Sequence, residues 1–163
     1  MRADRVRELY NRRQNYCYTS SIYREKVRAI DQKLAQRFGD DPAVILWHIS
    51  NEMGGDCHCA LCQAEFRRWL QARYGTLAAL NKAWNARFWS HDYTDWEQIE
   101  SPARMVKTPY SACARLEALC QRPTYRFLKF ERDTVKEIAP NAKFTANMMY
   151  RFDGIDYFKM AKE

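Results

Sequence analysis

An apolar run, Ala43-Val44-Ile45-Leu46-Trp47-His48-Ile49, constrains the fold of this chain more than any other feature. The run is rich in β-branched residues, which is typical of a strand buried on both faces of a parallel sheet. Helical patterns surround it, and a second strand candidate follows them. The expected helices span residues 21–38, 64–74, 76–85, 123–138 and 156–162, and the second strand spans 143–149. This alternation predicts an α/β fold with parallel strands.

Local signals mark where the first helix begins and ends. Ser20 or Ser21 is expected to begin it, and Gly39 is expected to end it before a turn. Apolar residues recur along it at intervals of three to five, which predicts one buried stripe. The stripe consists of Ile22, Val27, Ile30, Leu34 and Phe38.

Composition narrows the class of protein. The chain has 163 residues, 47% of them apolar and 29% charged, which is ordinary for a globular protein and excludes a disordered or collagen-like chain. Its longest apolar run is far shorter than the roughly 20 residues of a membrane span. The N-terminal residues 1–5 lead into charge, so no secretory signal is expected and a cytoplasmic location is predicted.

The positive charge raises the question of nucleic acid. There are 27 Lys and Arg against 20 Asp and Glu, a net charge of +7, and many of the basic residues lie near the N-terminus. Acidic residues such as Glu8, Glu25 and Asp31 are interspersed among them. No long run of like charge results, so a solvated helical face is the favoured interpretation.

Two polar residues follow the apolar run directly. Asn51 and Glu52 stand where it ends, and catalytic residues of parallel α/β folds gather at the carboxyl ends of strands. A carboxylate at the rim of an apolar strand is partly desolvated, which favours the protonated form that a general acid needs. The alternative is a solvent-facing loop glutamate that caps a neighbouring helix.

Three cysteines lie within six residues, in the pattern Cys57-x-Cys59-x2-Cys62. In a reducing compartment such clusters bind metal more often than they form disulfides. Structural zinc takes four ligands, so another must come from elsewhere. Cys17 is the leading candidate and His58 a weaker one, while the alternative is a set of incidental thiols.

Several motifs follow one another in a fixed order. They are Arg13–Ser20 with Tyr23-Arg24, Trp47–Gly55, the three clustered cysteines, Phe66–Leu70, Tyr74–Thr76, Leu80–Trp84, Phe88–Ser90, Phe144–Met148 and Asp156–Phe158. In this order they resemble glycoside hydrolase family 42, the (β/α)8-barrel β-galactosidases. The likeness begins at about residue 12, and residues 1–11 look like a poorly matching N-terminal extension.

The resemblance implies roles for individual side chains. Glu52 matches the acid/base carboxylate, and Asn51 matches the neighbour that hydrogen-bonds the sugar. Arg13 lies where the family has a sugar-contacting arginine, although Arg12 is one position away and stays an alternative. Trp89 matches a subsite tryptophan.

The resemblance also implies a metal. Cys17, Cys57, Cys59 and Cys62 match a four-thiolate zinc site, in agreement with the spacing. Such a zinc would be structural, with no open position for water. By joining two loops it would hold the surroundings of Glu52 rigid.

The chain departs from the family because it has no match for the nucleophile carboxylate or for most of the barrel strands. A retaining glycosidase needs a nucleophile as well as an acid/base carboxylate, and the late acidic residues Asp153, Asp156 and Glu163 match helix positions instead. A (β/α)8 barrel takes about 250 residues. Residues 1–163 are therefore expected to be a fragment of the catalytic domain, a partial (β/α)8 TIM barrel with about two of the eight strands. The likeness is weak around Cys113 and Cys120, which are expected to be plain buried thiols.

The expected function is retaining hydrolysis of terminal β-D-galactosides, with little turnover by this segment alone. The expected partners are a β-galactoside substrate and, for full-length relatives, further copies in a trimer, with no nucleic acid or membrane. One alternative is a basic, zinc-stapled module that binds nucleic acid. Another is a truncated product that does not function.

Overall fold

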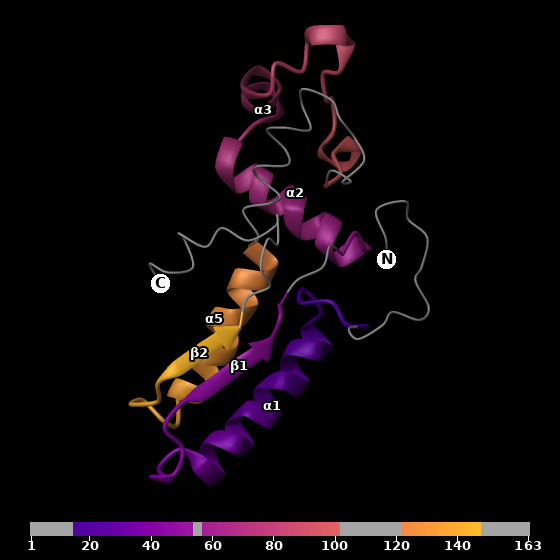
Figure 1. Ribbon diagram of the computed structural model, residues 1–163. Helices are drawn as coiled ribbons and strands as arrows, with labels where there is room; N and C mark the ends of the chain where they lie inside the picture. The colour runs from indigo at the N-terminus through magenta and orange to yellow at the C-terminus, as the bar shows by residue number, and fades with distance from the viewer. Residues whose placement is uncertain (1–14, 54–56, 102–121, 148–163) are drawn as a thin grey trace. The chain divides into compact units, whose positions relative to one another are not determined.

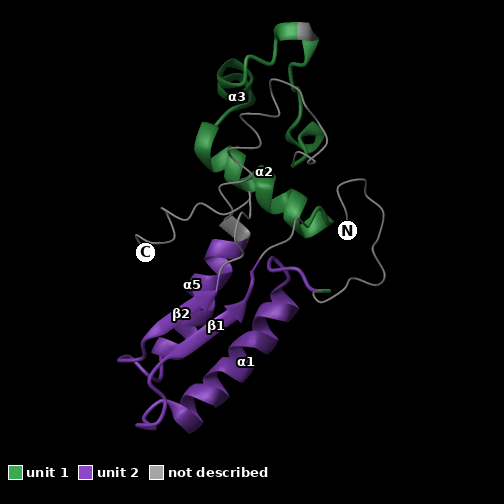
Figure 2. Cartoon of the chain, in the orientation of Figure 1, with its two compact units in different colours: residues 1–15, 56–120 green, residues 16–55, 121–163 purple. Residues whose placement is uncertain are grey.

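The computed structural model describes residues 15–53, 57–101 and 122–147 (Figure 1). The chain divides into two compact units (Figure 2): residues 1–15 and 56–120 form unit 1, and residues 16–55 and 121–163 form unit 2. The expected helix at residues 156–162, Cys113 and Cys120 lie outside the described residues. Within the described ranges, no helix has the length and apolar character needed to cross a membrane.

Unit 2 begins with helix α1, which spans Ser21–Phe38. Ser20 is the N-cap, because its Oγ accepts a hydrogen bond from the backbone N–H of Tyr23 at 3.3 Å. At the other end, the N–H of Gly39 donates to the carbonyl of Ala35 at 2.8 Å. These bounds confirm the predicted helix from its local start and stop signals.

The buried face of α1 differs from the predicted stripe. Ile22 and Ile30 are 69% and 57% exposed, and Leu34 and Phe38 are exposed as well. Of the predicted stripe, Val27 packs against the core, and the helix otherwise packs through Tyr23 and the buried Ala35, which are outside the stripe. The prediction was wrong because apolar spacing shows that a helix has an apolar face, but packing against α5 selects the face that is buried.

Two parallel strands form the sheet of unit 2. Strand β1 spans Trp47–Asn51 and strand β2 spans Phe144–Asn147, with helix α5, Arg122–Lys136, preceding β2 (Figure 1). Trp47 pairs with Phe144, and Asn51 pairs with Asn147. The parallel pair with a helix against it confirms the predicted α/β class.

Strand β1 is shorter and less buried than predicted. Asp41 holds a turn ahead of it, since its carboxylate accepts from the N–H of Ala43 at 2.9 Å and its carbonyl from that of Val44 at 3.0 Å. The first sheet hydrogen bond comes only at Trp47, and Ile45 is 83% exposed. In the described residues the sheet has two strands, so burial on both faces of the whole run is not observed.

Helix α5 contributes a residue to each of two core clusters of unit 2. Phe127 is fully buried against Tyr18 and Met53. Near the end of the helix, Val135 packs with Ala35 and Ala139 in the second cluster. The predicted amphipathic helix at residues 123–138 is therefore confirmed, with the expected face turned inward.

The described residues of unit 1 form two α-helices and two short 3-10 turns. Helix α2 spans Ala60–Tyr74 and α3 spans Leu77–Ala83, separated by Gly75 with a φ of 70°. The 3-10 turns η1 and η2 span Phe88–Ser90 and Trp96–Gln98, as expected of a loop with short helical pieces. Their shared core consists of Phe66, Leu70, Leu80, Trp84 and Ile99.

Candidate functional site

The carboxyl end of the strand pair in unit 2 gathers three polar side chains. Asn51 and Asn147 are the last residues of their strands and lie opposite each other. The Nδ2 of Asn147 donates to the Oδ1 of Asn51 at 3.0 Å, and its Oδ1 accepts from the backbone N–H of Glu52 at 3.2 Å. The predicted position of Asn51 and Glu52 at the end of a strand is confirmed.

The backbone leaves regular β geometry at this end. Ser50 and Glu52 have positive φ values of 47° and 50°, in the left-handed region that non-glycine residues seldom adopt. The strand register also shifts between His48 and Asn51. Irregular pairing of this kind changes the direction of the following side chains, and it is frequent beside active sites.

The side-chain carboxyl group of Glu131, in α5, contacts this irregular segment. The Ser50 hydroxyl donates to Oε2 of Glu131 in α5 at 2.5 Å. The pKa of Glu131 is raised to about 7, chiefly by burial and to a smaller extent by the charge of Asp31, against the opposing effect of the hydrogen bond from Ser50. Burial also raises the pKa of Asp31 to about 6, and its buried Oδ2 has no hydrogen-bond partner.

The residue after Glu52 is firmly anchored. Met53 is only 1% exposed and packs with Tyr18 and Phe127. Glu52 is itself partly buried. Glu52 therefore lies between the last residue of β1 and the buried Met53. Because the residues on both sides of it are held in place, its backbone is restricted.

Unit 1 contains a cluster of thiols. Cys59 is the N-cap residue of α2, and Cys62 lies in the first turn of that helix. The Sγ atoms of Cys57, Cys59 and Cys62 lie within 4.8 Å of one another, and those of Cys59 and Cys62 are 3.7 Å apart. Three convergent thiols suit a soft ion such as zinc.

The sequence named two other candidate ligands, His58 and Cys17. His58, the weaker candidate, is buried, and its Nδ1 lies 2.9 Å from the Ser101 hydroxyl. Cys17 belongs to unit 2 and is partly buried. It lies in the turn ahead of α1, where its carbonyl accepts from the N–H of Ser20 at 3.0 Å.

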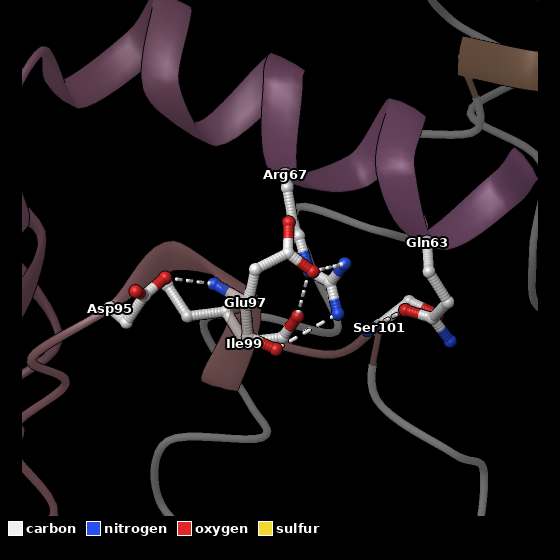
Figure 3. A network of polar contacts seen from close by, with 6 residues as sticks. All are labelled: Gln63, Arg67, Asp95, Glu97, Ile99 and Ser101. Atoms are coloured by element: carbon white, nitrogen blue, oxygen red, sulfur yellow. Dashed lines mark hydrogen bonds and ion pairs between the residues drawn. The ribbon is translucent and has the colours of Figure 1, made fainter. Parts of the chain in front are cut away.

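A polar network ties the segment after η2 to α2 (Figure 3). The Arg67 guanidinium donates to the backbone carbonyls of Ile99 and Glu97 at 2.8 and 2.9 Å and pairs with the Glu97 carboxylate. Gln63 accepts from the N–H of Ser101 at 2.8 Å. Gln63 follows Cys62 in α2, and the Ser101 hydroxyl lies beside His58, so the network connects residues next to the cysteines with the segment that ends at Ser101.

The remaining predicted site residues are described in part or not at all. Arg12 and Arg13 lie outside the described residues. Trp89 lies in η1, where only its backbone is described. Sequence reasoning missed Asn147, although its place at the end of the second expected strand was a usable signal; nothing in the pattern of α5 pointed to Glu131.

Comparison with known proteins gives the family. The sequence model of the family described as beta-galactosidase, glycoside hydrolase family 42, matches residues 1–163. Beta-galactosidase BglY of Alicyclobacillus acidocaldarius is 46% identical over 157 residues, which are 96% of this chain and 23% of that protein. Beta-galactosidase GanA of Bacillus subtilis is 43% identical over 168 residues, covering 98% of this chain and 25% of GanA.

A solved structure agrees with these relatives. The cold-adapted β-galactosidase from Rahnella sp. R3 superimposes with a TM-score of 0.85 at 45% identity, over 98% of this chain and 24% of that one. The fold is thus that of part of a glycoside hydrolase. The chain belongs to glycoside hydrolase family 42 and spans about a quarter of the length of the β-galactosidases it matches.

Proposed function

We propose that the chain carries the acid/base half of the active site of a retaining β-galactosidase. The observation behind this proposal is the Asn51-Glu52 pair at the carboxyl end of parallel strands, joined to the opposite strand through Asn147. Glu52 would protonate the glycosidic oxygen and later deprotonate the water that releases galactose. Asn51 would hydrogen-bond the sugar.

The chain also requires a wider framework for this chemistry. We infer a partial (β/α)8 barrel in which β1 and β2 are neighbouring strands, supported by their parallel pairing and the family membership. Arg13, or Arg12 beside it, would contact the sugar, and Trp89 would form a subsite wall. A cytoplasmic location, a trimer of the longer enzyme, and the absence of nucleic-acid or membrane partners belong to the same proposal.

The nucleophile is the second carboxylate that the proposal needs. Retaining glycosidases hold it about 5–5.5 Å from the acid/base group, and no acidic residue of this sequence matches it. The 163 residues alone are therefore expected to hydrolyse a β-galactoside slowly or not at all.

The cysteines would hold one structural zinc ion. We propose Cys57, Cys59 and Cys62 as three thiolate ligands, which their short mutual distances support. Cys17 would be the fourth, since a closed zinc site needs four ligands. The ion would supply no chemistry to the reaction and would stabilise the segment that follows Glu52 in the chain.

Hydrolysis by a chimera tests the proposed role of Glu52. The matched segment of GanA is replaced by these 163 residues, and hydrolysis of aryl β-galactosides is measured. Glu52→Gln should lower kcat/KM by about 10²–10⁴-fold, as loss of general acid–base catalysis does. The loss in the glycosylation step should be smaller for a dinitrophenyl leaving group, because it needs little protonation to depart.

The control for this experiment is Glu25→Gln, a conservative change at an exposed residue of α1. It should leave hydrolysis unchanged. A Glu52→Gln chimera as active as its parent on all leaving groups would contradict the assignment.

A further inference from the structure

Ser50 has a backbone conformation that its own residue type does not favour. Its φ of 47° lies in the left-handed region, which a non-glycine residue seldom adopts because its Cβ crowds the following carbonyl oxygen. Conformations of this kind persist where surrounding contacts determine them. The register shift between His48 and Asn51 contains Ser50, so whatever holds Ser50 also holds the start of the irregular segment.

The contact that holds the Ser50 side chain comes from α5. Glu131 accepts from the Ser50 hydroxyl at 2.5 Å, across 81 residues of sequence. Glu131 lies on the same helix face as Phe127 and Thr134, four residues before it and three after it, and both are 0% exposed. Since these neighbours are fully packed, the Glu131 carboxyl group has little freedom to follow Ser50 if that residue moves.

The proposed acid/base residue, Glu52, lies only two positions after Ser50, so a change in the Ser50 backbone would also change the position of Glu52. Asn51 directly follows Ser50, and its side chain accepts a hydrogen bond from the Asn147 side chain. The Oδ1 of Asn147 in turn accepts from the backbone N–H of Glu52. If Ser50 returned to a negative φ, the backbone after it would change direction. The Asn51 side chain and the backbone N–H of Glu52 would then move away from the Asn147 amide. The hydrogen bond from Ser50 to Glu131 and the two bonds of Asn147 therefore hold the same short segment, residues 50–52.

We propose that Glu131 is a positioning residue, which fixes Ser50 in its left-handed conformation and thereby aims Asn51 and Glu52. The relevance to hydrolysis rests on the proposed function of Glu52, but the geometric claim does not. Glu131 acts on the backbone through Ser50 and contributes no group to the reaction itself.

Backbone measurements on the 163-residue chain test the geometric claim. The amide of Glu52 and the side-chain amide of Asn147 are followed by NMR, together with a coupling constant that reports φ of Ser50. Glu131→Gln should leave all three signals in place, because a carboxamide oxygen accepts from a hydroxyl as well. Glu131→Leu should change the Ser50 coupling and speed exchange of the Glu52 amide by about tenfold, as loss of one hydrogen bond does.

The matched control is Glu137→Leu, one residue beyond α5. Glu137 is exposed and pairs with Arg28 of α1, so this variant loses a carboxylate and gains a leucine without touching Ser50. It should leave the Ser50 and Glu52 signals unchanged. Equal changes in Glu137→Leu and Glu131→Leu would overturn the proposal, because they would trace to the helix and not to the contact.

Ser50→Ala provides the second arm and tests the proposal even if Glu131→Leu does not fold. It removes the hydroxyl while leaving α5 unchanged, and it should reproduce the faster exchange of Glu52. In the double variant the two changes should not add, since both delete one interaction. Unchanged Glu52 exchange in Ser50→Ala would overturn the proposal.

The GanA chimera connects the geometry to the reaction. Glu131→Leu should lower kcat about tenfold or more with little change in KM, because a small misplacement of a reacting group affects the transition state. Glu131→Gln should restore kcat. If the parent chimera is inactive, the proposed function fails while the NMR result on Ser50 stands by itself; an active Glu131→Leu chimera with unchanged kcat would overturn the positioning role.

Discussion

The pKa of Glu131 depends on the residues that surround its carboxyl group. Glu131 stands on the buried face of α5, faces Ser50 of β1, and lies near Asp31 and Tyr23 of α1. Burial favours the protonated form, so the pKa rises from 4.5 to about 7. The folded state therefore holds this proton more tightly than the unfolded chain does.

The stability of the chain should fall as the pH rises between about 5 and 7. The unfolded chain releases the Glu131 proton first, so the folded state binds more protons in this interval and loses free energy relative to it. With solvent screening, we expect a loss of about 1–2 kcal/mol. Urea unfolding at several pH values measures it.

Glu131→Gln is the matched variant for this pH dependence. It has no proton to lose, so its unfolding free energy should stay level between about pH 6 and 7, where that of the wild type falls, and should exceed the wild-type value above pH 7. A slope that persists in the variant would assign the dependence to another group. Asp31, whose pKa is raised to about 6, accounts only for a slope at lower pH.

Arg67 is the corresponding polar residue of unit 1. Its guanidinium donates to two backbone carbonyls, an arrangement that a single ammonium group does not reproduce. Arg67→Lys should therefore destabilise the chain by about 1–3 kcal/mol in urea unfolding.

Glu97→Ala is the control for the Arg67 prediction. The Glu97 side chain is 77% exposed, so loss of its ion pair should cost about 0–1 kcal/mol. A loss in Glu97→Ala as large as that in Arg67→Lys would show that the ion pair, and not the carbonyl contacts, is the stabilising feature.

At the scale of elements, helix bounds followed from the sequence more closely than helix faces did. Ser20, Thr76 and Gly39 begin or end their helices where expected, because caps depend on residues within one turn. The apolar row of α1 is largely exposed, and Ala35 and Val27 make the contact with α5. Ala35, which lies outside the periodic apolar row, thus forms part of the helix–helix contact, and Val27 is the member of the row that is packed there.

Substitutions in the packed core and in the exposed apolar row of α1 should differ sharply in their effect on the free energy of unfolding. Phe127→Ala in α5 should destabilise the chain by about 3–5 kcal/mol, since it removes a fully buried ring from a packed cluster. Ile22→Ala in α1, at a residue 69% exposed, should cost about 0.5 kcal/mol or less. Thermal unfolding of both variants checks this, and comparable losses would place the core on the predicted stripe.

At the scale of the whole molecule, the chain corresponds to about a quarter of its β-galactosidase relatives. The proposed zinc site would contribute free energy to folding, because a preformed site rarely exists in the unfolded chain.

The purified chain should hold about one zinc ion. Cys57→Ser should lose it and unfold at a lower temperature, whereas Cys113→Ser, outside the proposed ligands, should keep it. Metal analysis and thermal unfolding with and without a chelator measure both effects. Full zinc content in Cys57→Ser would contradict the proposed ligand set.

The sequence by itself determined the order of helices and strands, their caps, the cysteine spacing and the polar pair at the end of β1. Each of these depends on residues that are close along the chain. Only the tertiary structure decided that β1 begins at Trp47, that Asn147 joins Asn51 to Glu52, and that Glu131 contacts Ser50. The residues in these contacts lie 81 to 96 positions apart, and local periodicity holds no information about which distant side chain a fold will bring near.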